Sequence, residues 1–60
     1  MPITLEQQIK GAERELAMRQ RFYKKAVEQG RMELVEAEYE IELMEAILNT
    51  LKTVKEPNLL

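Results

Sequence analysis

Residues 26–37 read AVEQGRMELVEA and place one glycine between two stretches of helical pattern. Glycine adopts the left-handed backbone that ends a helix at lower cost than any other residue, so Gly30 is expected to end the first helix. Arg31 and Met32 complete a connection of about three residues, and so short a connection makes its flanking helices antiparallel neighbours. The stretch therefore predicts a helical hairpin with its turn at residues 30–32.

The first helix is expected over about residues 4–29, which contain no proline. Thr4 is a suitable N-cap, and Gln7, three residues later, completes a capping box. Gly11 costs about 1 kcal/mol relative to alanine in a helix interior. We expect that cost to be tolerated near a fraying end, with close approach of another helix as the alternative. The apolar stripe, within about 40° of one line, contains Leu5, Ile9, Ala12, Leu16, Tyr23 and Val27, with Arg19 and Ala26 at its edge.

The second helix is expected over about residues 33–55 and has the clearest apolar pattern in the chain. Its apolar residues recur at alternating spacings of three and four, as in the a and d positions of a heptad. Pro57 stops the pattern, so residues 56–60 are expected to form a loose tail. The predicted fold is an all-α, antiparallel two-helix hairpin. Its seam consists of Leu16, Tyr23, Val27, Leu34, Ala37, Ile41, Met44, Leu48 and Leu51.

Charges divide unequally between the two helices. Residues 4–29 hold six basic and four acidic side chains, whereas residues 31–56 hold three basic and seven acidic ones. Folding at the turn is expected to bring Arg19, Arg21, Lys24 and Lys25 alongside Glu36, Glu38, Glu40 and Glu42. Exposed pairs contribute only about 0.2–1 kcal/mol each, so they are expected to select the register and not to hold the hairpin together.

The second helix has more apolar surface than one partner helix covers. Each large apolar side chain left in water forgoes about 1.5–3 kcal/mol, and small scaffolds without disulfides commonly oligomerise. We therefore expect a homo-oligomer, with a two-fold dimer forming a four-helix bundle favoured over a larger helical assembly. The expected interface consists of Met18, Phe22, Val35, Tyr39, Leu43, Ala46, Ile47 and Val54.

The composition argues against an enzyme. The chain contains no cysteine, histidine, serine, aspartate or tryptophan, so it lacks the usual nucleophile–base pairs and the commonest metal ligands. We expect no catalytic residues, no cofactor and no metal site. No apolar run approaches the roughly 20 residues that span a bilayer, and the N-terminus has no signal-peptide pattern. A cytoplasmic location without membrane association is expected by default.

A basic stripe on the first helix offers an alternative function. Lys10, Arg14, Arg21 and Lys25 fall on one line, opposite the apolar stripe. Lysine and arginine neutralise backbone phosphates, so the stripe is a candidate contact for nucleic acid. A solvated face is the competing interpretation, because glutamates lie nearby and no aromatic platform accompanies the stripe. A third hypothesis is an inhibitor that docks its helix on a host protein.

Residues 14–51, RELAMRQRFYKKAVEQGRMELVEAEYEIELMEAILNTL, resemble short uncharacterised proteins of proteobacterial phage and prophage regions. Fifteen positions carry the resemblance: Glu15, Leu16, Met18, Arg19, Tyr23, Val27, Gly30, Arg31, Met32, Glu40, Ile41, Met44, Ala46, Ile47 and Leu48. The chain departs from the pattern at Lys24, where proline is usual, and at Glu33, where threonine is usual. The resemblance implies a helical hairpin and no established activity. The sequence thus predicts a self-associating structural or protein-interaction module, plausible as a phage-derived protein.

Overall fold

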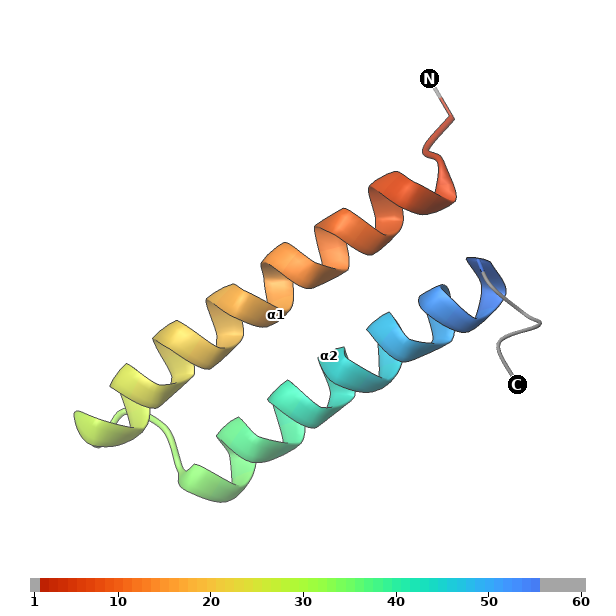
Figure 1. Cartoon of the computed structure of the whole chain (residues 1–60). Helices are drawn as coiled ribbons and strands as arrows, with labels where there is room; N and C mark the ends of the chain where they lie inside the picture. Colours follow the sequence, from red (N-terminus) through yellow and green to blue (C-terminus); the bar gives the residue numbers. More distant parts are fainter. Residues whose placement is uncertain (1, 56–60) are drawn as a thin grey trace.

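The computed structural model describes residues 2–55 as two α-helices that run antiparallel, side by side (Figure 1). Helix α1 comprises Leu5–Glu28 and helix α2 comprises Leu34–Lys55. The predicted all-α hairpin is confirmed. The tail expected at residues 56–60 lies outside the described residues.

The start of α1 is fixed by the predicted capping box. The Gln7 backbone N–H donates to Thr4 Oγ1 at 3.1 Å, and the Thr4 backbone N–H donates to Gln7 Oε1 at 2.8 Å. Two backbone donors are thereby satisfied at a helix end that leaves its first N–H groups without helical partners. The prediction from Thr4 and Gln7 is confirmed.

The end of α1 is a Schellman motif centred on Gly30. Gly30 has a φ of 72°, in the left-handed region. Its N–H donates to the Val27 carbonyl at 3.1 Å, and the Arg31 N–H donates to the Ala26 carbonyl at 2.8 Å. These are the two hydrogen bonds that define the motif, and the glycine predicted to end the helix is confirmed in that role.

Helix α2 starts at Leu34, one residue later than expected from the sequence. The Ala37 N–H donates to the Glu33 carbonyl at 3.0 Å, which closes the first helical turn. Glu36 in the first turn and Lys52 and Lys55 in the last turn match the polarity of the helix dipole. The charge pattern along α2 therefore supports the helix from both ends.

The core lies mainly in the open half of the hairpin, which we define as residues 5–16 and 44–55. Ile9, Ala12, Met44 and Leu48 form a buried cluster, and Leu5, Leu16 and Leu51 pack against it. In the turn half, residues 17–43, the buried side chains are two alanines, Ala26 and Ala37. Ala26 was expected only at the edge of the apolar stripe. Its burial shows that α1 turns this edge toward α2 near the turn.

The predicted seam is wrong at Leu34, whose side chain is 60% exposed. Leu34 is the first residue of α2 and borders an open groove between it and Lys24, Val27 and Glu28 of α1, so its side chain stays largely in solvent. Of the other seam residues, Ala37, Met44 and Leu48 are buried. The half-buried ones are Leu16, Tyr23, Val27, Ile41 and Leu51.

The charge pairing between the helices is also corrected. Two ion pairs join α1 to α2: Glu13 Oε2 to Lys52 Nζ at 3.9 Å, and Glu6 Oε1 to Lys55 Nζ at 3.4 Å. Both join an acidic residue of α1 to a basic residue of α2, the reverse of the expected polarity. Among residues 2–55, none of the expected pairs between α1 cations and α2 carboxylates forms. Exposed charges near the turn gain little from pairing and stay hydrated.

Candidate functional site

Large apolar side chains are exposed along both helices. All eight residues of the expected interface are exposed in the single chain. The large ones among them are each at least 40% exposed, and Val35 is the most exposed at 77%. Soluble monomers rarely expose contiguous apolar patches of this kind without a binding role. Their arrangement around the hairpin therefore defines the candidate site.

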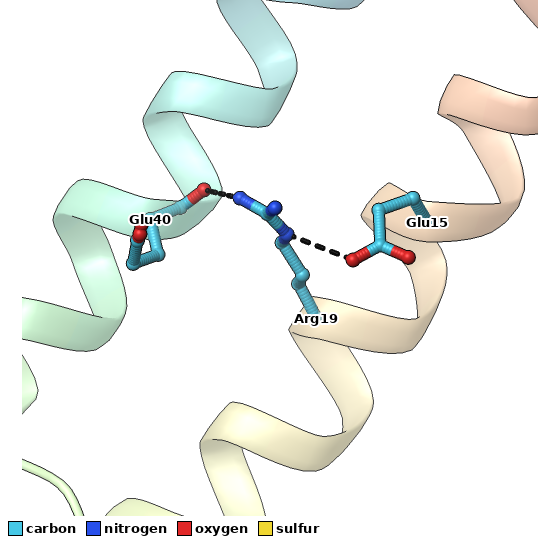
Figure 2. A network of polar contacts seen from close by, with 3 residues as sticks. All are labelled: Glu15, Arg19 and Glu40. Atoms are coloured by element: carbon cyan, nitrogen blue, oxygen red, sulfur yellow. Dashed lines mark hydrogen bonds and ion pairs between the residues drawn. The ribbon is translucent and has the colours of Figure 1, made fainter.

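Arg19 fixes the orientation of the two helices in the turn half (Figure 2). Its Nη1 donates to the backbone carbonyl of Glu40 at 2.9 Å, and its Nε donates to Glu15 Oε1 at 3.1 Å. The arginine thus reaches a main-chain atom of α2, although its expected partners were side-chain carboxylates. Its side chain is 21% exposed. The flanks of α1 and α2 that carry this contact face the same side of the hairpin.

Two exposed residues of α1 lie on this flank. Met18 and Phe22 follow Glu15 by three and seven residues, which places all three in one row along the helix. Since Glu15 contacts Arg19, this row borders the side of the hairpin on which Arg19 crosses to α2. Met18 and Phe22 therefore face the same side as the Arg19–Glu40 contact.

Three exposed residues of α2 lie on the matching flank. Leu43 and Ile47 follow Glu40 by three and seven residues, and Val54 follows Ile47 by another seven. They lie beside the Glu40 position along successive turns of α2. We define the apolar face as Met18, Phe22, Leu43, Ile47 and Val54. Two helices thus contribute to one continuous side of the hairpin.

The remaining members of the expected interface lie elsewhere. Val35 and Tyr39 are each two residues from the buried Ala37, and Ala46 is two residues from the buried Met44. A separation of two residues corresponds to about 160° around a helix. These three side chains therefore point away from α1, along the outer edge of α2. The structure divides the expected interface into two surfaces.

The side opposite the apolar face is charged. Glu13 lies six residues before Arg19, and Lys52 lies twelve residues after Glu40. Both separations rotate the side chain by about 120° from the Arg19–Glu40 contact. The ion pair between Glu13 and Lys52 therefore lies across the hairpin from the apolar face. The two broad sides of the molecule differ in chemistry.

The basic stripe lies on the outer edge of α1. Lys10, Arg14, Arg21 and Lys25 are all exposed, and none belongs to an ion pair recorded within residues 2–55. The Arg21 guanidinium lies 5.6 Å from the centroid of the Phe22 ring, within cation–π range. The stripe therefore borders the apolar face at Phe22.

Two open grooves flank the turn half. One, of about 210 Å³, lies on the charged side and is lined by Lys24, Val27, Glu28, Leu34, Ala37, Glu38 and Ile41. The other, of about 410 Å³, adjoins the apolar face and is lined by Phe22, Tyr23, Lys25, Ala26, Arg31, Met32 and Glu36. Ala26 and Ala37 are too short to fill the space beside them. The second groove extends the apolar face toward the turn.

The acidic side chains remain dispersed. Within the described part of the chain, no three carboxylates gather in a way that could hold a metal ion. Neither α1 nor α2, over residues 2–55, is long and apolar enough to cross a bilayer.

Comparisons with protein families, with curated proteins and with solved structures find no match to this chain. The resemblance to phage and prophage proteins stays a prediction. The candidate site therefore depends on the geometry of the hairpin alone. Its cross-helix polar contact escaped the sequence prediction because the acceptor is a main-chain carbonyl. The position of Arg19 at the edge of the apolar stripe was the available signal.

Proposed function

We propose that this chain is a non-enzymatic helical hairpin that self-associates and serves as a structural or protein-interaction module. The observation that carries the proposal is the apolar face of Met18, Phe22, Leu43, Ile47 and Val54, each at least 40% exposed. Burial of such side chains contributes about 1.5–3 kcal/mol each. A domain this small has a net stability of only a few kcal/mol, so the apolar face is large enough to decide its assembly.

Sedimentation equilibrium tests self-association directly. We expect the unmodified chain to sediment as a dimer or larger species at micromolar concentration. Ile47→Gln, on the apolar face, should shift the population toward monomer because it places a polar amide in the interface. Ala17→Gln is the matched control, since Ala17 is exposed on α1 away from the apolar face. A folded, monomeric unmodified chain at this concentration would contradict the proposal.

A second candidate function is nucleic-acid binding through Lys10, Arg14, Arg21 and Lys25. The observation that favours it is the exposure of all four side chains on the outer edge of α1. Affinity for duplex DNA and for RNA should then fall steeply with salt, because phosphate contacts release counterions. Replacing Arg14 and Lys25 with glutamine should reduce the salt slope by about two. Absence of salt-sensitive binding to either nucleic acid would reject this candidate.

A further inference from the structure

Gly11 has no explanation within the single chain. It lies in the interior of α1, where glycine lowers helix stability relative to alanine. A Cβ added at Gly11 would meet no atom within 4 Å, and the only glycine with positive φ is Gly30. Neither a close contact nor the backbone conformation therefore requires glycine at this position. The space that the missing side chain leaves is therefore free for a contact outside the chain.

Gly11 belongs to a second stripe on α1, distinct from the seam with α2. Gly11, Glu15, Met18 and Phe22 are separated by four, three and four residues, the spacing of a coiled-coil stripe. Met18 and Phe22 belong to the apolar face, and Glu15 contacts Arg19 on the same side. The stripe has its smallest residue at one end and its largest at the other.

We propose that two copies of the chain pack apolar face to apolar face, with α1 antiparallel to α1, so that Phe22 of each copy lies on Gly11 of the other. This inference rests on the self-association proposed above and specifies its orientation. A two-fold axis perpendicular to α1, between Glu15 and Met18, pairs residue 11 with residue 22 and residue 15 with residue 18. The large ring and the missing side chain then meet twice, as a self-complementary two-fold interface requires.

The charges agree with this orientation. The same axis places Arg19 of one copy within about one residue of Glu15 of the other, measured along α1. Arginine has five N–H donors, and Arg19 uses two of them within the chain. The others remain available to the second copy's Glu15 carboxylate. The interface therefore contains a cation for each carboxylate that the stripe buries.

The parallel orientation matches the surface less well. With turns at the same end, α1 of one copy would lie on α2 of the other. The Arg19–Glu40 contact fixes which residues of α1 and α2 lie at the same height along the hairpin. Phe22 of one copy would then face the region of Glu36 in the other copy. That contact would take a carboxylate out of water against an aromatic ring, which is unfavourable without a paired cation. The antiparallel orientation places Phe22 against Gly11 instead.

A size-exchange experiment tests the pairing. Gly11→Leu should weaken dimerisation of the full chain at least tenfold, because the introduced side chain meets Phe22 of the second copy. Phe22→Ala alone should also weaken it, by leaving a void. An equimolar mixture of the two variants should form the heterodimer well above the statistical half. In that heterodimer, one junction joins the introduced leucine to the introduced alanine, and the other retains the native glycine and phenylalanine.

Native mass spectrometry measures the heterodimer fraction, since the variants differ in mass. Ala17→Leu, on the outer side of α1, is the control and should dimerise like the unmodified chain. Circular dichroism should show that Gly11→Leu retains its helices, because leucine favours helix more than glycine. If Gly11→Leu dimerises normally and the mixture stays statistical, the Gly11–Phe22 pairing is overturned while self-association stands. A monomeric unmodified chain would instead overturn both proposals.

Discussion

The open half and the turn half of the hairpin contain similar lengths of helix but differ in what fills the space between α1 and α2. In the open half, Ile9, Met44 and Leu48 form a cluster of long aliphatic side chains around Ala12. In the turn half, the buried side chains are Ala26 and Ala37, and a groove opens on either side of them. The space between the two helices is thus well packed in the open half and only loosely filled in the turn half.

The difference follows from how each end is connected. Near the turn, the chain itself keeps α1 and α2 together, so the entropy cost of bringing these segments together is small. Far from the turn, nothing covalent opposes separation, and apolar burial must hold the helices. The loose half is also where the Arg19–Glu40 contact and the larger groove lie. Most of the exposed large apolar side chains, among them Met18, Phe22 and Leu43, therefore lie in the turn half.

The largest expected effect is in the open half. Leu48→Ala should destabilise the hairpin by about 2–4 kcal/mol, because it removes a buried side chain and leaves a cavity. Leu34→Ala, at the turn, should change stability by less than about 0.5 kcal/mol, because Leu34 is 60% exposed. Chemical denaturation at one fixed protein concentration, followed by circular dichroism, measures both. Equal losses from the two substitutions would contradict the division into packed and loose halves.

The next effect concerns the turn itself. Gly30→Ala should cost about 1–2 kcal/mol, because alanine is strained at a φ of 72°. No atom lies within 4 Å of the added Cβ, so the cost comes from the backbone conformation and not from a clash. Gly30→Asn is the control and should cost less, since asparagine tolerates the left-handed region better. A Gly30→Ala variant as stable as the unmodified chain would show that closure of this end does not depend on the Schellman motif.

The parts of the fold that local sequence determines were predictable. Thr4 with Gln7, and Gly30, act through hydrogen bonds and dihedral angles within a few residues, so they can be identified without the partner helix. Leu34 shows the limit of prediction from local sequence. It has the spacing of a seam residue, but its burial depends on which side of α2 faces α1, and Leu34 borders the open groove on the charged side.

The candidate site required the relative rotation of the helices. The sequence identified the exposed apolar residues, but it did not separate the apolar face from Val35, Tyr39 and Ala46 on the outer edge of α2. That division depends on which flank of each helix meets the other. The burial of Ala26 and Ala37 between the helices, and the contact of Arg19 with a main-chain carbonyl, reveal this rotation. The expected ion pairs were wrong for the same reason. The sequence predicts which residues of the two helices lie at the same height along the hairpin, but not how each helix is rotated about its own axis.

A smaller effect is expected from the polar contact in the turn half. Arg19→Gln should destabilise the hairpin by about 0.5–1.5 kcal/mol, because it removes the hydrogen bond to the Glu40 carbonyl. Arg14→Gln is the matched control, since Arg14 is exposed on the same helix. Denaturation at fixed concentration measures stability, and amide exchange in α2 near Glu40 reports the local change. Equal stability of the two variants would mean that the turn and the buried Ala26 and Ala37 are enough to stabilise the turn half, and that the Arg19–Glu40 hydrogen bond adds nothing measurable.

The smallest effect is expected from the ion pairs across the charged side. Glu13 and Lys52 have side chains that are 51% and 54% exposed, with 3.9 Å between the charged atoms. Solvent and salt screen such a pair, so its coupling energy should be below about 0.5 kcal/mol. A double-mutant cycle with Glu13→Gln and Lys52→Gln, repeated at low and high salt, measures this coupling. A coupling above about 1 kcal/mol that persists at high salt would mean that ion pairs, as well as the buried apolar cluster, stabilise the open half. A negligible coupling would mean that burial of Ile9, Met44 and Leu48 holds the two helices together at this end of the hairpin, where no covalent link opposes their separation.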